Sequence, residues 1–300
     1  MKIKPDLYLK GVFMGIAEII PGVSGGTIAF ITGIYEELID SIKSVNSRSL
    51  KLLLTFKFAS FWKAINGSFL ITLIIGMLTS ILILSRFIVY LIDDHPLKIW
   101  GFFFGLIIAS GILIFYQIEK ISIAGLLSFV IGLTIASYIA LQAPSITPNT
   151  NFFIFLSGAI AISAMILPGI SGSFILVFLS KYEFILKALN SFDTAVISVF
   201  LAGCIVGLVT FSRVFSYLFK KYSDVVVSAL IGFLGGSLFK IWPFYEVLEY
   251  NSSNEPIYTT PILPTTNQSN DLIFFFTFVV IGFISMWVLE KKFIGLNKEI

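Results

Sequence analysis

The chain is poor in the residues that build disulfides, metal sites and soluble surfaces. Its 300 residues include one cysteine, Cys204, and one histidine, His95. A single cysteine excludes a disulfide framework and a thiolate metal cluster, and a single histidine excludes a metal site with several histidine ligands. Charged residues make up only 12% of the chain, about half the share of a typical soluble domain. The net charge of +3 gives no indication of a nucleic-acid partner.

Apolar residues take the place of the missing charges. Hydrophobic residues account for 57% of the chain, which contains 32 phenylalanines, and the mean hydropathy is +0.97. So much apolar surface cannot be buried in soluble cores of this size. The composition therefore predicts an all-α polytopic membrane protein that forms a single membrane domain over residues 1–300. No removable signal peptide is expected, because no small-residue cleavage site follows the basic N-terminus.

Six apolar runs reach the ~20 residues that a helix needs to cross a bilayer. We predict transmembrane helices at 68–92, 97–118, 121–141, 194–219, 225–244 and 272–289. Two further apolar stretches, 7–42 and 152–189, are broken by Pro21-Gly22 and Pro168-Gly169. Proline removes a backbone donor and glycine frees φ, so a continuous helix should stop at each pair. Each stretch is either a bent span or a re-entrant hairpin of two half-helices.

The distribution of Lys and Arg favours the hairpins, because basic residues accumulate on the cytoplasmic side. The N-terminus and the segment 43–66 are both basic, and one crossing by 7–42 would put them on opposite sides. With two hairpins and six spans, 14 of the 20 basic residues lie inside. Both termini are then cytoplasmic. Residues 43–66 are predicted to form an amphipathic insert on the cytoplasmic surface or an ordinary loop, and 243–271 an external loop.

The sequence repeats itself. A shift of 147 residues aligns 21–36 with 168–183, with seven of sixteen positions identical, and a shift of 127 aligns Ser85-Arg86 with Ser212-Arg213. This pattern predicts two repeats, 7–141 and 152–290, each a Pro-Gly-broken re-entrant hairpin followed by three transmembrane helices. Three spans are an odd number, so the repeats have inverted topology. Inverted repeats with broken helices are typical of secondary transporters.

The two Pro-Gly-x-Ser-Gly motifs are candidates for binding an anion. A half-helix that begins inside the bilayer has unpaired N–H groups and a positive dipole end. Glycines allow close approach, and hydroxyl groups add donors. The candidate substrate-binding residues are Gly22, Ser24, Gly25, Gly26 and Thr27 in the first motif and Gly169, Ser171, Gly172 and Ser173 in the second. The alternative is that these residues only shape a tight turn.

The few charges within the predicted spans are further candidates. Arg86 and Arg213 are paired across the repeats and would bind an anionic headgroup near either leaflet, or only snorkel to the interface. Glu18 precedes the first break and would carry a coupling proton or sodium ion, or cap the turn. The remaining coupling or gating candidates are the repeat-related pairs Glu36 and Glu183, and Tyr35 and Tyr182, which otherwise serve as interfacial anchors.

An enzymatic interpretation has one motif in its favour. Residues 22–26 match G-x-S-x-G, the pattern around some serine nucleophiles. Such a serine needs a base that orients it, and the sole histidine is in a predicted external turn. Two equivalent nucleophile motifs on opposite sides of a membrane would serve no reaction, so we expect no enzyme.

The paired motifs also carry a family resemblance. The segments GIAEIIPGVSGGTIAFITGIYEELI and MILPGISGSFILVFLSKYEFIL resemble the bacterial polyprenyl-phosphate transporters, formerly a membrane domain of unknown function. The resemblance covers nearly the whole chain, and it departs at Ser180, where the family pattern has glycine as at Gly33. It implies return of undecaprenyl phosphate from the outer to the inner leaflet of the bacterial cell membrane, without a cofactor. The alternative is a channel or exchanger for a small inorganic anion.

Overall fold

The computed structural model describes residues 4–19, 24–116, 118–142, 147–250, 256–264 and 269–293. Within these residues six helices are long and apolar enough to cross a membrane, which confirms the predicted spans. They are α6 (Gly67–Asp94), α7 (Pro96–Phe115), α8 (Ile123–Leu141), α12 (Thr194–Lys221), α13 (Ser223–Ile241) and α14 (Ser269–Phe293). The chain is thus a mostly helical, multi-pass membrane protein.

Each of the two Pro-Gly-broken stretches forms three short helices. The first contains α1 (Pro5–Ile19), α2 (Gly25–Ile31) and α3 (Tyr35–Lys43), and the second contains α9 (Asn151–Ile166), α10 (Gly172–Phe178) and α11 (Tyr182–Asn190). The additional break after α2 and α10 was not predicted. It falls at Gly33, with φ of 71°, and at Ser180, with φ of 53°. A right-handed helix cannot continue through a residue with positive φ, and Ser180 adopts this conformation without being glycine.

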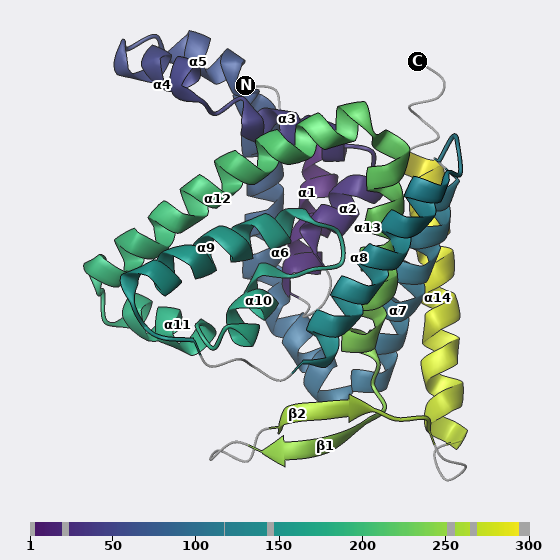
Figure 1. Ribbon diagram of the computed structural model, residues 1–300. Helices are drawn as coiled ribbons and strands as arrows, with labels where there is room; N and C mark the ends of the chain where they lie inside the picture. The colour runs from purple at the N-terminus through teal and green to yellow at the C-terminus, as the bar shows by residue number, and fades with distance from the viewer. Residues whose placement is uncertain are drawn as a thin grey trace.

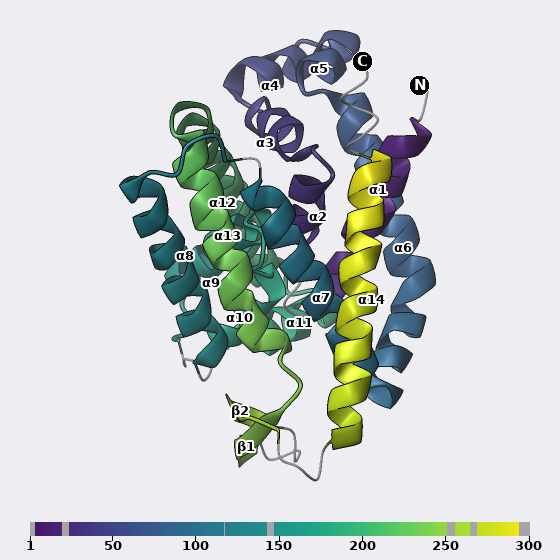
Figure 2. The same cartoon turned by 90° about the vertical axis from the view of Figure 1, so that its right-hand side faces the viewer.

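The helices pack in pairs. The structure places α1 against α6, α9 against α12, α7 against α14 and α8 against α13, and Figure 2 shows the last two pairs side by side. Small residues allow the backbones to approach closely. Gly11 lies against the backbone of Leu73, and Gly105 lies against that of Val279. A side chain at either glycine would collide with the neighbouring helix.

The outer faces of the bundle are apolar, whereas the core surrounds the first broken stretch. Leu126 on α8 is 60% exposed and Ile273 on α14 is 64% exposed. Such surfaces suit a lipid environment. In contrast, Ala29 and Ile31 of α2 are buried with residues of α7 and α13.

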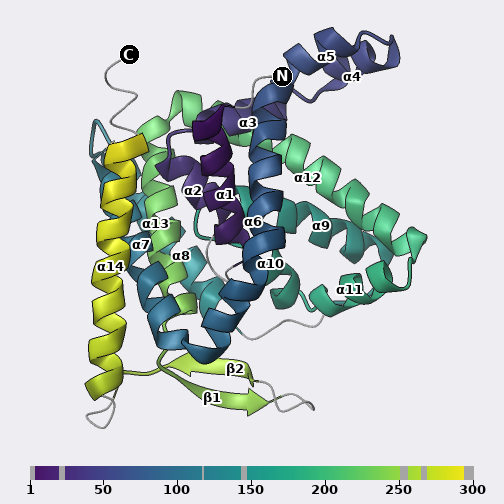
Figure 3. The same ribbon diagram turned by 180° about the vertical axis from the view of Figure 1, so that it is seen from behind.

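Two connecting segments lie at opposite ends of the molecule (Figures 1 and 3). One end carries α4 (Ser47–Leu54) and α5 (Phe58–Ala64) beside α3. These two helices lie within the segment 43–66 and are separated at Phe56, which has a φ of 55°. The other end carries β1 (Tyr245–Tyr250) and β2 (Pro256–Pro261), an antiparallel pair. The segment 243–271, expected to be an external loop, thus contains a pair of strands.

Candidate functional site

The two Ser-Gly motifs meet inside the bundle. Ser24 Oγ donates a hydrogen bond to the carbonyl oxygen of Met165 at 3.0 Å, and the N–H of Gly169 donates to Thr27 Oγ1 at 3.0 Å. Ser24 and Thr27 are fully buried. Residues more than 140 positions apart in the chain are therefore joined at one place. Gly22, the remaining candidate of the first motif, lies outside the described residues.

Close backbone contact accompanies these hydrogen bonds. A Cβ atom added to Gly26 would lie 2.5 Å from the carbonyl oxygen of Ile166. The same carbonyl accepts a hydrogen bond from the Tyr35 hydroxyl at 3.0 Å. Tyr35, a gating candidate from the sequence, is thus buried and tied to the end of α9.

The first motif uses its own N–H groups internally. The N–H of Gly25 donates to Glu18 Oε1 at 2.8 Å, and the N–H of Gly26 donates to Ser24 Oγ at 3.0 Å. The N–H of Thr27 donates to the Ser24 carbonyl oxygen at 2.9 Å. The N–H groups of Gly25, Gly26 and Thr27 are therefore occupied within this chain, the first of them by the Glu18 carboxylate.

The second motif is more open. Ser171 is buried, whereas Ser173 is exposed, and their hydroxyl oxygens are 2.8 Å apart. The Ser171 side chain makes no hydrogen bond that caps α10. Gly172 packs against the α9 backbone, where an added Cβ would lie 2.8 Å from the Ala161 carbonyl oxygen. Met165 takes the place that Glu18 has in the first repeat, so no carboxylate occupies this motif.

Two lysines near the second hairpin were not singled out from the sequence. The Nζ atom of Lys240 lies 4.4 Å from the ring centroid of Phe174, the residue after Ser173. Lys181 is fully buried, and its Nζ atom donates to the carbonyl oxygen of Thr147 at 2.6 Å. A lysine ending an apolar span was a signal for Lys240, but only the fold places it beside the motif.

The paired arginines do not join the motifs. Arg86 and Arg213 are exposed, on α6 and α12 respectively. Among the described residues, the structure shows no hydrogen bond or ion pair to either guanidinium. Their positions fit contact with lipid headgroups rather than with the buried junction.

The other gating candidates differ between the repeats. Tyr35 is 3% exposed, whereas Tyr182 is 40% exposed. Glu36 is exposed at the start of α3, and Glu183 forms an exposed ion pair with Lys187 at 3.3 Å. The two hairpin ends are therefore equivalent in sequence but not in their surroundings.

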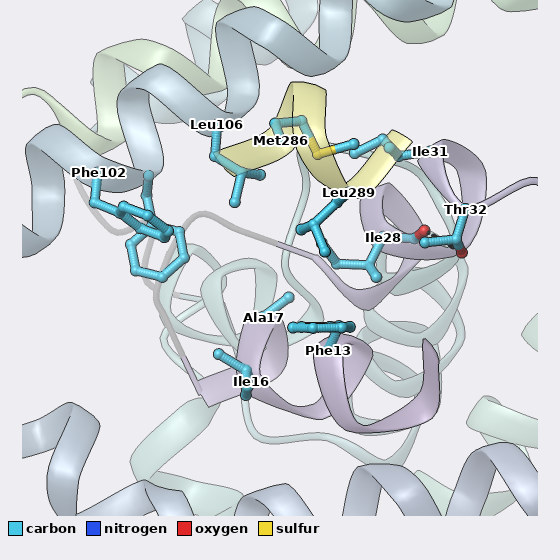
Figure 4. Close-up of a pocket in the computed structure, with 11 residues that line it drawn as sticks. Phe13, Ile16, Ala17, Ile28, Ile31, Thr32, Phe102, Leu106, Met286 and Leu289 are labelled. Atoms are coloured by element: carbon cyan, nitrogen blue, oxygen red, sulfur yellow. Dashed lines mark hydrogen bonds between the residues drawn. The ribbon is translucent and has the colours of Figure 1, made fainter. Parts of the chain in front are cut away.

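An apolar cavity of about 190 Å³ lies beside the first motif. Side chains from α1, α2, α7 and α14 converge on it (Figure 4). Ala17 and Ile28, the neighbours of Glu18 and Thr27 in sequence, belong to its wall. The other lining residues are Phe13, Ile16, Ile31, Thr32, Phe102, Phe103, Leu106, Met286 and Leu289. A space suited to hydrocarbon is thus lined by residues that adjoin the first motif on α1 and α2.

Comparison with known proteins gives consistent matches over most of the chain. A family model described as undecaprenyl phosphate translocase-like matches residues 14–257. A polyprenyl-phosphate transporter of Vibrio cholerae is 46% identical over 252 residues, which cover 83% of this chain and 82% of that protein. A polyprenyl-phosphate transporter of Staphylococcus aureus is 34% identical over 257 residues, with 78% and 85% covered. No solved structure matches the chain.

Proposed function

Because the chain belongs to the undecaprenyl phosphate translocase-like family and is a polyprenyl-phosphate transporter, we propose that it returns undecaprenyl phosphate from the outer to the inner leaflet of the bacterial cell membrane. Moving a phosphate monoester through ~30 Å of hydrocarbon is prohibitive without a polar path. The isoprenoid chain, in contrast, can stay in an apolar environment throughout. The protein therefore has to shelter mainly the headgroup.

The two halves of the chain are inverted repeats that move relative to each other. Matched packing supports this proposal. Gly11 lies against Leu73 in the first half, and Gly158 lies against Phe200 in the second. Gly158 is 147 residues after Gly11 and Phe200 is 127 residues after Leu73, so the two contacts correspond to each other in the repeat alignment. The last two spans of each half also pack across the halves, since α7 of the first half packs on α14 of the second and α8 packs on α13. Such pairing is expected when two similar units associate about a pseudo-two-fold axis.

The end of the molecule with α4 and α5 is cytoplasmic in our proposal. The positive-inside count supports this orientation. The start of α1 and the end of α14 lie at the same end as α4 and α5 (Figures 1 and 3). Both termini then face the cytoplasm, and β1 and β2 lie on the external side.

The headgroup binds where the two motifs meet, and this junction is the observation that carries the proposal. Ser171 and Ser173 offer hydroxyl groups, and Lys240 supplies a cation over the ring of Phe174, the residue after Ser173. At the first motif an anion must displace the Glu18 carboxylate from Gly25. Two further cations, Arg86 and Arg213, attract the headgroup at the lipid-facing surface of either half.

The apolar cavity holds the part of the isoprenoid chain next to the phosphate. Its volume of about 190 Å³ is below the ~300 Å³ of the smallest pockets for drug-sized ligands. Most of the isoprenoid chain therefore remains in the bilayer. A channel for a small inorganic anion would gain nothing from such a cavity beside its binding site, so the cavity favours a lipid substrate.

Proteoliposomes test this function. A labelled polyprenyl phosphate is placed in the outer leaflet, and its loss from the accessible surface is followed with purified protein or with empty liposomes. Transport of the lipid without chloride flux is expected. Chloride flux without lipid movement would contradict the proposal and favour the anion channel.

Glu18 couples transport to a proton or sodium ion in this proposal. Its carboxylate is within hydrogen-bond distance of the motif, at 2.8 Å from Gly25 N. The Glu18→Gln variant keeps an acceptor oxygen and removes the charge. We expect the lipid transport of this variant to lose its response to an imposed ion gradient. An unchanged response to both gradients would remove Glu18 from the coupling step.

A further inference from the structure

The ends of the two hairpins are in different states in this structure. Tyr35 and Ile39 of α3 are 3% and 2% exposed, because α3 packs on α12. The residues 147 positions later, Tyr182 and Leu186 of α11, are 40% and 42% exposed. The first hairpin end is therefore closed against its neighbour, and the second is open.

Aromatic side chains form the buried part of the closed contact. The Tyr35 ring meets the rings of Phe30 and Phe215 edge-on, with centroids 5.1 and 5.6 Å away. Phe211, Phe215 and Phe219 follow one another along one face of α12, and the ring of Phe215 contacts the other two. This arrangement gives α3 a defined docking position on α12.

A polar network closes the rim of the same contact. Asp40 accepts a hydrogen bond from the Ser216 hydroxyl at 2.8 Å and forms an ion pair with Lys220, while Lys43 donates to the Ser216 hydroxyl oxygen at 3.0 Å. Burial would raise the pKa of Asp40, but the bonds from Lys220 and Ser216 and the charges of Lys220 and Lys43 lower it below its ordinary value. The ion-paired side chains remain 39% and 50% exposed, and partly exposed ion pairs are weak enough to open.

The repeat register exchanges the two charges of this ion pair. Lys187 of α11 takes the position of Asp40, 147 residues later, and Asp93 of α6 takes the position of Lys220, 127 residues earlier. Within the described residues, Lys187 forms its ion pair with Glu183 of the same helix, and both side chains are largely exposed. Figures 1 and 3 show α11 standing away from the end of α6 that leads into α7.

We propose that Asp40–Lys220 and Asp93–Lys187 are alternating ion pairs, each closing one side of the transporter in one of its two states. This inference rests on the proposed motion of the two repeats. The present structure is closed at the end that carries α4 and α5. In the other state α3 leaves α12, α11 docks on α6, and Lys187 exchanges Glu183 for Asp93. Because one ion pair forms as the other breaks, the two states stay close in free energy and the bound lipid can shift their populations.

Cross-linking with the charges left intact tests the alternation. In a Cys204→Ser background, Asn190→Cys and Val89→Cys occupy the positions that correspond to Lys43 and Ser216, whose side chains touch in this structure. Cross-linking between residues 190 and 89 reports docking of α11 on α6. The matched control joins Asn190→Cys to Tyr90→Cys, which is one residue out of register.

Charge reversal then shifts the equilibrium. Asp40→Lys should increase the 190–89 cross-link several-fold, and adding Lys220→Asp should return it to the starting yield. Lys187→Asp should reduce both lipid transport and the yield of the 190–89 cross-link, and adding Asp93→Lys should restore both. Restoration by the exchanged pair is not expected if Lys187 serves only stability. An unchanged cross-link in Asp40→Lys, or no restoration by the exchanged pair, would overturn the inference. Cross-linking needs no substrate, so the proposed lipid specificity can fail without affecting this result.

Discussion

Replacing Gly26 with alanine tests whether the two motifs must touch. The added Cβ would lie 2.5 Å from the carbonyl oxygen of Ile166 and 3.2 Å from that of Met165. Both atoms belong to the backbone of α9 and cannot rotate away. Overpacking of this kind costs about 1–3 kcal/mol, and here it also separates Ser24 from Met165. We therefore expect lower stability together with strongly reduced lipid transport.

Gly111→Ala is the matched control for this change. Gly111 is also helical, but its added Cβ would meet only Ile231 Cγ2, at 3.9 Å. Alanine in a helix is favoured over glycine by up to about 1 kcal/mol, so this variant should be at least as stable as the wild type. Thermal unfolding of both purified variants and transport in liposomes provide the comparison. A Gly26→Ala protein with wild-type unfolding and transport would refute the close contact between the motifs.

Substitutions at four more residues probe the junction and its surroundings. Thr27→Val leaves the buried N–H of Gly169 without its acceptor and should cost about 1–3 kcal/mol of stability in unfolding measurements, whereas Thr27→Ser keeps the hydroxyl and should behave as wild type. Arg86→Ala and Arg213→Ala change exposed side chains, so the free energy of unfolding should change by less than about 0.5 kcal/mol. The initial rate of lipid transport should fall in both variants. Normal transport rates in both would make the two arginines interfacial anchors. Lys240→Gln should raise the lipid concentration needed for half-maximal transport and Lys240→Arg should not, a contrast that disappears if the charge is irrelevant.

The sequence was sufficient for the spans and for the helix break at Pro168-Gly169. Each span is a continuous apolar run, and length plus hydropathy are the physical requirements for crossing a bilayer. Pro168-Gly169 ended a helix as expected because neither residue supports a continuous one. The additional break at Ser180 was missed, because serine has no strong preference for positive φ. The strands β1 and β2 were missed as well, since a single polar hairpin has only a weak sequence pattern.

The candidate site was only partly predictable, since it depends on contacts between distant segments. The motifs identified Ser24 and Thr27, but nothing local indicated that they bond to the end of α9 and the start of the second motif. The same limitation applies to Lys240, whose neighbour Phe174 is 66 residues away. The repeat predicted equivalent residues, but it could not predict that Tyr35 is buried while Tyr182 is exposed.

The unequal motifs imply different roles for the two halves of the chain in the proposed mechanism. Their backbones are alike, but a carboxylate occupies the first motif and a methionine stands in its place at the second. In that mechanism a phosphate that enters at Ser173 meets the hydroxyl groups of Ser171 and Ser173 before it reaches the Glu18 side chain. Further approach to Gly25 brings two anions together, and this costs free energy unless Glu18 moves away or takes up a cation. In the proposed mechanism, the step at Glu18 is therefore the one that requires a cation, and it has no counterpart at Met165 of the second motif.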